Sequence, residues 1–442
     1  MGAITSGVAE VGVAILGYGT VGKGVARAIR DNGAHIENKT GFKLRLLHVL
    51  DLLDFPDSPE AGILTHDIRD VVNDAEVSVV VETMGGLKAA FEYTKEAFSK
   101  KKHVVTSNKE LVAEYGPELL EAAGANGVHY RFDASVGGGI PVITPIAECL
   151  AVSRIYEITG ILNGTTNYML TYMRENGAEF SETLAMAQRE GYTEQNPAAD
   201  IEGTDACRKL AILSSLIWDK FLDWKRIHTE GIAKVKPEDI ANAADLGRVI
   251  KLAAGARMLD GGAVEAYVSP VMLDRRNALA HVEGVNNAIM TSCDLNGDVM
   301  LYGMGAGMLP TGGAVVSDII KVAATLCAGI PCTGDVNTGR RCREPRWDRD
   351  DALETADFNS YKRNFYARVE TDRPDAVRNA IFREFPEARL LPVNPCFAGD
   401  DNAARSCAFT VQKLAEGNFA EGCANIIKSV AGTAVGFIAR LL

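Results

Sequence analysis

The sequence has 442 residues, enough for two or three domains of roughly 150 residues each. Hydrophobic residues make up 47% of it and charged residues 24%, which is typical of a soluble globular protein. The formal net charge of −12 argues against the basic surface that binding to nucleic acid requires. Nine cysteines without a CxxC pair favour reduced thiols in the cytoplasm over a disulfide framework or a zinc site. With no signal-peptide core and no apolar run of about 18 residues, we expect no membrane association.

The first third of the chain predicts a dinucleotide-binding domain. An apolar run at residues 11–16 indicates a buried strand, the sequence GYGTVG follows at residues 17–22, and apolar residues then repeat at helical spacing. Gly17 permits the tight turn, Gly19 lets the backbone approach a pyrophosphate, and Gly22 lets the helix lie close to the strand. The helix would offer its free N–H groups to the anion.

The second strand, expected at residues 44–50, ends in Asp51. A carboxylate at this position binds the ribose hydroxyls of NAD, whereas NADP requires an arginine for its additional phosphate. The nearest arginine downstream is Arg69. NAD is therefore the expected cofactor, with NADP as the alternative.

Strand and helix patterns continue to alternate up to residue 132, which predicts a parallel sheet. Ligands of such sheets bind at the carboxyl ends of the strands. Lys109 is expected there, in the loop that follows a strand beginning at His103. The other expected elements are strands at 77–81 and 129–132 and helices at 91–102 and 115–125.

Residues 191–209 carry four carboxylates, at Glu194, Asp200, Glu202 and Asp205. Asp205 and Lys209 are four residues apart, so they share a face on a helix. A small substrate with an ammonium group and a carbonyl group would fit such a segment, because the carboxylates can bind the ammonium and the lysine can bind the carbonyl oxygen. Alone, the segment is more typical of a solvated acidic loop followed by a salt bridge; the dinucleotide fingerprint favours a substrate site, in which only Glu202 is interpreted as structural.

Together these motifs make the chain resemble the homoserine dehydrogenase family, in which the same motifs occur in the same order. The matching segments are residues 17–22, 106–109, 134–141, 160–167, 191–194, 200–209 and 305–311. The resemblance implies reversible hydride transfer between a nicotinamide cofactor and aspartate 4-semialdehyde, with homoserine as the reduced product, in threonine and methionine biosynthesis. Departures from the family pattern at 268–280 and 310–313 leave open a dehydrogenase of a related short amino-acid aldehyde. A catalytically silent, cofactor-binding sensor is the other alternative.

The resemblance also implies roles for individual residues. Lys209 and Lys109 become the lysines beside the reacting oxygen, and Asp205 orients Lys209. Glu194 holds the substrate ammonium, and the further substrate contacts are Asp200, Gly191, Thr193 and Asn163. The expected cofactor contacts are Gly17, Tyr18, Gly19, Thr20, Val21, Gly22, Asp51, Thr83, Ser107, Lys109 and Gly307.

The family places a monovalent cation, such as sodium, near the loop that follows the sheet. The matching positions are Asp133, Val136, Gly138 and Ile140, the last three through backbone carbonyls. Hard oxygen ligands suit sodium and do not suit zinc. The family's glutamate is here the shorter Asp133, which draws the carboxylate away from the ion.

The expected fold is α/β, with a Rossmann-type parallel sheet, an α+β substrate-binding and dimerisation domain, and a small C-terminal α+β domain. The last of these resembles an ACT domain that binds an amino-acid effector, with threonine as the expected inhibitor; a dimer-stabilising tail is the alternative. The family implies a homodimer or higher homo-oligomer. The expected boundaries are 1–135 completed by 312–338, then 136–311, an exposed linker at 339–360, and 361–442.

Overall fold

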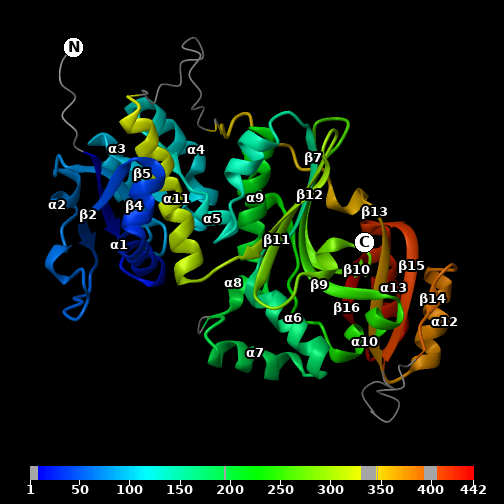
Figure 1. Ribbon diagram of the computed structural model, residues 1–442. Coiled ribbons are helices and arrows are strands. Elements are labelled where there is room, and N and C mark those ends of the chain that lie inside the picture. Colours follow the sequence, from blue (N-terminus) through cyan, green and yellow to red (C-terminus); the bar gives the residue numbers. More distant parts are fainter. Residues whose placement is uncertain (1–7, 194–195, 330–344, 346, 393–405) are drawn as a thin grey trace. The chain divides into compact units, whose positions relative to one another are not determined.

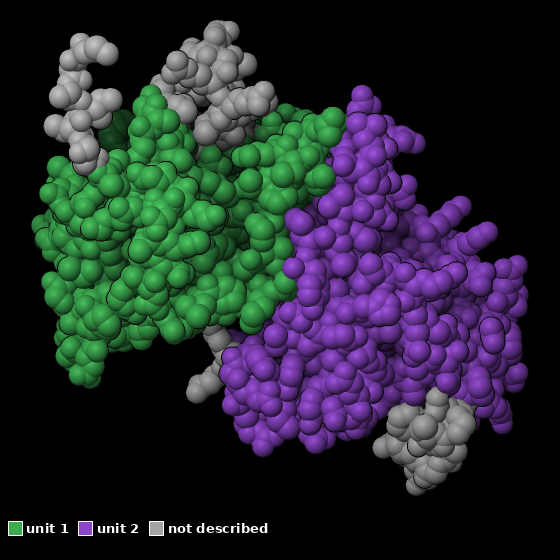
Figure 2. Space-filling view, viewed as in Figure 1, with its two compact units in different colours: residues 1–152, 211–223, 303–353 green, residues 153–210, 224–302, 354–442 purple. Residues whose placement is uncertain are grey.

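The computed structural model describes residues 8–193, 196–329, 345, 347–392 and 406–442. These residues divide into two compact units, coloured separately in Figure 2. Unit 1 comprises residues 1–152, 211–223 and 303–353, and unit 2 comprises residues 153–210, 224–302 and 354–442.

Unit 1 is built around a six-stranded parallel sheet with the order β3-β2-β1-β4-β5-β6. Figure 1 labels β2, β4 and β5 of this sheet. Strands buried on both faces of a parallel sheet read as apolar runs, as residues 11–16 of β1 and 79–81 of β4 do. The strands are β1 (Ala9–Leu16), β2 (Phe42–Leu50), β3 (Leu64–Thr65), β4 (Val77–Glu82), β5 (His103–Thr106) and β6 (Tyr130–Arg131). The helices of this unit include α1 (Thr20–Thr40), α2 (Ile68–Val72), α3 (Lys88–Ser99), α4 (Lys109–Asn126), α5 (Ala134–Gly137) and α11 (Met308–Cys327).

Helix α11 returns from late in the sequence to the core of the dinucleotide-type sheet. Val315, Ile319 and Val322 are buried in the same apolar cluster as residues of β1 and α1. By length and composition alone α11 could cross a membrane, contrary to the expectation that no apolar run is long enough, but half of its most apolar stretch is buried inside the protein. The apolar character of α11 is therefore explained by its place in the core.

Unit 2 contains a mixed sheet that, within the described residues, has ten strands. Its order is β12-β11-β7-β9-β10-β16-β13-β15-β14, with β8 paired to β10. The strands are β7 (Ile155–Ile161), β8 (His228–Thr229), β9 (Arg248–Met258), β10 (Val264–Asp274), β11 (Asn286–Cys293), β12 (Gly297–Met304), β13 (Lys362–Thr371), β14 (Arg389–Leu390), β15 (Ser406–Ala415) and β16 (Thr433–Leu441). The helices are α6 (Gly164–Asn176), α7 (Phe180–Arg189), α8 (Ala198–Ile201), α10 (Pro237–Asp245), α12 (Pro374–Glu384) and α13 (Glu416–Ser429). Helix α9 (Thr204–Trp218) belongs to unit 2 up to Leu210 and to unit 1 from Ala211 onward.

The C-terminal strand β16 connects two parts of this sheet. It pairs in parallel with β10, through Val271 and Arg440, and antiparallel with β13. The Arg440 guanidinium is buried and donates to both oxygens of Glu230 and both oxygens of Glu416. Burial alone would raise the pKa of Glu230, but hydrogen bonds from His228 and Arg440 outweigh it and lower this pKa to about 2. The last strand is thus held by backbone pairing and by a buried ion-pair cluster.

The expected α/β fold, with a Rossmann-type parallel sheet and a second, mixed-sheet part, is confirmed. The expectation of an exposed linker is wrong at Trp347 and Leu353, which are buried; Trp347 packs on Phe132 and Phe221 within unit 1. A large aromatic side chain gains free energy from burial even when its neighbours in the sequence are charged. The domain boundaries and the ACT-like identity of residues 361–442 stay predictions.

Candidate active site

The turn between β1 and α1 has the geometry of a pyrophosphate cradle. Gly17 has a φ of +92°, and a Cβ atom on Gly22 would lie 2.0 Å from the Gly17 carbonyl oxygen, so both positions require glycine. Gly19 has open space where a Cβ would be. Gly19 is also the N-cap of α1 and supplies no side-chain cap, which leaves the first N–H groups of the helix available for an anion. These residues fit a bound dinucleotide.

Asp51 lies at the carboxyl end of β2, beside this turn. Its carboxylate accepts hydrogen bonds from the N–H groups of Tyr18 at 2.6 Å and Leu53 at 3.0 Å. An ionised carboxylate has further lone pairs, so ribose hydroxyls can still be accommodated. Next to Tyr18 is a cavity of about 490 Å³, whose lining includes Phe55 and the basic residues Lys23, Arg27 and Arg30 of α1. Sequence reasoning missed these three bases because they precede Asp51 in the chain and reach this cavity only through the fold.

The loops after β4 and β5 are joined by one buried carboxylate. Glu82 ends β4 and is fully buried, and it accepts hydrogen bonds from the Met84 N–H at 2.9 Å and the Thr106 hydroxyl at 2.6 Å. Burial raises the pKa of Glu82 to about 7, against the lowering effect of these hydrogen bonds. The next residue, Thr83, donates from its hydroxyl to the Gly17 carbonyl at 2.8 Å. Thr83 therefore lies beside the glycine turn, as expected of a cofactor contact.

Lys109 is the first residue of α4, so the expectation of a loop lysine is wrong. The Asn108 side chain caps the helix by accepting the Leu111 N–H at 3.0 Å, and its amide donates to the Gly86 carbonyl at 2.9 Å. The helix had been expected to begin only at Tyr115, where the structure has a kink with non-helical backbone angles. An asparagine N-cap was the signal that would have placed Lys109. Ser107 precedes it, and Gly307, with a φ of +120°, is the N-cap of α11.

In unit 2, Asn163 brings two of the expected acids together. Its side-chain amide donates to Asp200 at 2.7 Å and to Asp205 at 2.9 Å. Its side-chain oxygen accepts the N–H of Thr166 at 2.8 Å and so caps α6. Thr193 donates to the other oxygen of Asp200 at 3.0 Å. The side chains of Asn163, Asp200, Asp205 and Thr193 therefore form one polar cluster.

Lys209 completes this cluster on the first turns of α9. Its ammonium contacts Asp205 at 2.9 Å and donates to the Leu162 carbonyl at 2.8 Å. Both side chains are nearly buried, which distinguishes the pair from an ordinary surface salt bridge. The Leu162 carbonyl was not anticipated, since backbone acceptors leave no mark in a sequence. Gly191 is close by, with a φ of +75°, whereas Glu194 lies outside the described residues.

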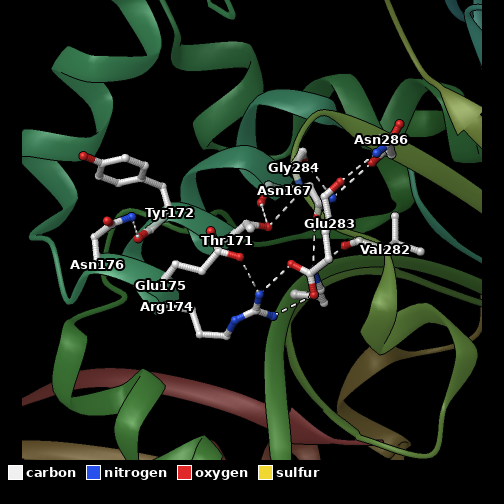
Figure 3. A network of polar contacts seen from close by, with 11 residues as sticks. Asn167, Thr171, Tyr172, Arg174, Glu175, Asn176, Val282, Glu283, Gly284 and Asn286 are labelled. Atoms are coloured by element: carbon white, nitrogen blue, oxygen red, sulfur yellow. Dashed lines mark hydrogen bonds and ion pairs between the residues drawn. The ribbon is translucent and has the colours of Figure 1, made fainter.

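Helix α6, which carries this cluster at its N-terminus, is fixed further along by a second polar network (Figure 3). Arg174 makes a bidentate ion pair with Glu283, at 2.8 and 2.7 Å. Asn167 donates to the carbonyls of Gly284 and Asn286. The buried Lys251 ammonium donates to the Asn167 side chain at 2.9 Å, and burial lowers the pKa of Lys251 to about 8. These contacts restrict the rotation and sliding of α6.

The positions expected to bind a monovalent cation do not fit one. Val136 lies in α5, and Gly138 and Ile140 follow it. The carboxylate of Asp133 accepts hydrogen bonds from the backbone N–H groups of Val142 and Ile143 and contacts the ammonium of Lys321. The side chain that would bind the ion is therefore already occupied. Among the described residues, no cluster of histidine, cysteine, aspartate and glutamate has the composition of a metal site.

Two sequence families match the chain and together span most of it. The profile described as "Homoserine dehydrogenase, NAD binding domain" matches residues 17–133, and the one described as "Homoserine dehydrogenase" matches residues 141–320.

Individual relatives agree with these families. A homoserine dehydrogenase of Synechocystis is 42% identical over 323 residues, covering 72% of this chain and 74% of the relative. Among solved structures, a homoserine dehydrogenase from Thiobacillus denitrificans superposes with a TM-score of 0.85 at 34% identity, covering 98% of both chains. A hyperthermophilic archaeal homoserine dehydrogenase mutant in complex with NADPH gives a TM-score of 0.59 at 26% identity, covering 71% of this chain and 98% of that one.

The raised pKa of Glu82 predicts a specific pH dependence of stability. Between the ordinary pKa of 4.5 and about 7, folded Glu82 keeps a proton that the unfolded chain releases, so stability falls as pH rises through this window. The loss reaches at most about 3 kcal/mol. Glu82→Gln cannot titrate and should lack this component. We therefore expect the urea-unfolding midpoint of the wild type to fall, relative to that of Glu82→Gln, as the pH is raised from about 5 to 8. Midpoints of the two proteins that change in parallel over this range would contradict the account.

Proposed function

Because this chain belongs to the homoserine dehydrogenase family, an NAD(P)-dependent oxidoreductase, we propose that Lys209 exchanges the proton of the substrate oxygen. The observation that carries the proposal is the nearly buried ammonium of Lys209, held between Asp205 and the Leu162 carbonyl. The reaction interconverts homoserine and aspartate 4-semialdehyde, and no observation favours the alternatives of a related aldehyde substrate or a silent sensor.

The chemistry assigns a role to each member of the cluster. When the aldehyde is reduced, negative charge develops on its oxygen, and the Lys209 ammonium stabilises that charge and supplies the proton. In the reverse direction the same nitrogen receives the proton of the alcohol. Asp205 fixes the ammonium by ion pairing, and Asn163 fixes Asp205. NAD(P), when bound, accepts or returns the hydride.

The remaining roles rest on the family resemblance. Asp200, held by Asn163 and Thr193, is proposed to receive the substrate ammonium together with Glu194, and Gly191 to shape the adjoining backbone. Lys109, at the N-terminus of α4, is proposed as the second lysine of the proton transfer.

Replacing the proton donor should abolish turnover without unfolding the protein. In Lys209→Met the aliphatic part of the side chain is kept and the ammonium is lost, so kcat should fall by about 100- to 10,000-fold. The affinity for the reduced cofactor, measured by fluorescence titration, should be unchanged. Lys234→Met, at an exposed lysine of the same unit, serves as the matched control. A Lys209→Met enzyme with the kcat of the control would contradict the proposed role.

We further propose that NAD is preferred over NADP. Asp51 would meet the ribose hydroxyls, and a carboxylate repels an additional phosphate. Of the bases lining the adjacent cavity, Arg30 is paired with Glu60 and Arg27 with Asp31. Within the described part of the chain Lys23 has no carboxylate partner and lies over the rings of Tyr18 and Phe55. Residual NADP activity would therefore depend on Lys23.

Initial rates of homoserine oxidation test this preference. We expect a higher kcat/KM with NAD, and in Lys23→Met a reduced kcat/KM for NADP with little change for NAD. Lys39→Met is the control, because Lys39 is an exposed lysine near the other end of α1. A wild-type enzyme that prefers NADP, and loses this preference in Lys23→Met, would overturn the assignment.

A homo-oligomer in the cytoplasm and an amino-acid effector at residues 361–442 complete the proposed function. The effector proposal is supported by the way these residues join the sheet of unit 2, since β16 pairs with β10 and Arg440 binds Glu230. A ligand that moves this strand would act on the same sheet that carries α6.

Threonine is the amino acid to test, because the resemblance of residues 361–442 to an ACT domain led us to expect it as the inhibitor. We expect threonine to inhibit homoserine oxidation in the wild-type enzyme, with a concentration dependence that serine at equal concentration does not reproduce. An inhibition curve that stays flat in excess threonine would reject regulation through residues 361–442 by this amino acid.

A further inference from the structure

Lys321 is the centre of a buried charge cluster in unit 1. Its ammonium contacts Asp133 at 3.5 Å and Asp318, one turn earlier on α11, at 3.2 Å. It also donates to the hydroxyl of Thr144. Two carboxylate oxygens and one hydroxyl oxygen thus surround the nitrogen. These are the hard oxygen ligands that a sodium or potassium ion would use.

The carboxylate oxygens of Asp133 and Asp318 already have hydrogen-bond or ion-pair partners within the protein. One oxygen of Asp133 accepts the N–H groups of Val142 at 3.1 Å and Ile143 at 3.0 Å, and the other faces Lys321. Asp318 accepts the Asp133 N–H at 2.9 Å with the oxygen that Lys321 does not contact. Asp133 and Asp318 are 5% and 1% exposed, whereas the Lys321 side chain is half-buried, so the two carboxylates depend on these partners more than on water.

The charges of the cluster also balance without an added ion. Asp133 and Asp318 contribute two negative charges, Lys321 contributes one positive charge, and the guanidinium of Arg131 acts electrostatically on Asp318. The cavity that these residues line has a volume of about 20 Å³, which accommodates about one water molecule. A metal cation here would lie next to the Lys321 ammonium, and the two like charges would repel each other.

We propose that the Lys321 ammonium replaces the monovalent cation of the family, so that the enzyme requires neither sodium nor potassium. The shorter Asp133 and the lysine act together: the lost methylene leaves room for an ammonium delivered from α11. The fixed charge ties the loop after the sheet to helix α11, which begins at Met308. A tethered cation cannot dissociate at low salt.

The wild-type enzyme tests this directly. The protein is dialysed into tetramethylammonium chloride, an ion too large for any oxygen cage, and compared with samples in NaCl and KCl at equal ionic strength. We expect the same kcat/KM for homoserine oxidation and the same unfolding temperature in all three salts. A kcat/KM or an unfolding temperature that depends on Na⁺ or K⁺ would overturn the inference. The unfolding temperature does not depend on the proposed catalytic roles, so the two can fail separately.

Lys321→Met tests the same inference from the side of the protein. Without the ammonium, the carboxylates of Asp133 and Asp318 are left buried and facing each other, and the unfolding temperature should drop by about 5 °C or more. Lys100→Met, at an exposed lysine of the same unit, is the matched control. Equal unfolding temperatures for Lys321→Met and Lys100→Met would contradict a buried role of this charge. If Lys321→Met does not fold, the salt comparison on the wild type decides alone.

Discussion

The proposed substrate site of this enzyme depends on one amide side chain, that of Asn163. A single residue caps α6 with its oxygen and binds Asp200 and Asp205 with its nitrogen. Two carboxylates within reach of each other repel unless a donor or a cation lies between them. Here the donor is neutral and belongs to the helix end, which leaves the charge of Lys209 available to Asp205 and, in the proposed mechanism, to the substrate oxygen. The position of the helix thus sets the position of the acids.

That helix position is itself fixed at a distance from the chemistry. The Arg174–Glu283 pair and the contacts of Asn167 with the loop at Gly284 hold the remainder of α6 against β11. At the C-terminus, strand β16 pairs with β10, and Arg440 of β16 forms an ion pair with Glu230. Removing one partner from a buried charge cluster of this kind costs about 3–5 kcal/mol, because the other charges stay buried. The C-terminal strand therefore contributes to the stability of the unit that holds the site.

Much of this could be predicted from the sequence, where local signals decide the structure. The glycine turn, Asp51 at the end of the second strand and the Asp205–Lys209 pair are each marked by residue types within a few positions in the sequence, and all were located. The start of α4 was missed because Lys109 was assigned to the loop after the strand, although Asn108 supplied a cap. Lys321 and Glu82 were missed for a different reason. Their partners Asp133 and Thr106 are distant in the sequence, and a single lysine or glutamate in an apolar segment has no periodicity to mark it.

The most direct test of the central claim separates the two functions of Asn163. In Asn163→Ser the hydroxyl can still cap α6, but no amide reaches Asp200 and Asp205. The account predicts a kcat for homoserine oxidation lower by about 100-fold, since misplacement of catalytic groups by about 1 Å has that effect, at an unfolding temperature close to the wild type. A variant with wild-type kcat and KM would show that the acids hold their positions without Asn163, and would contradict the account.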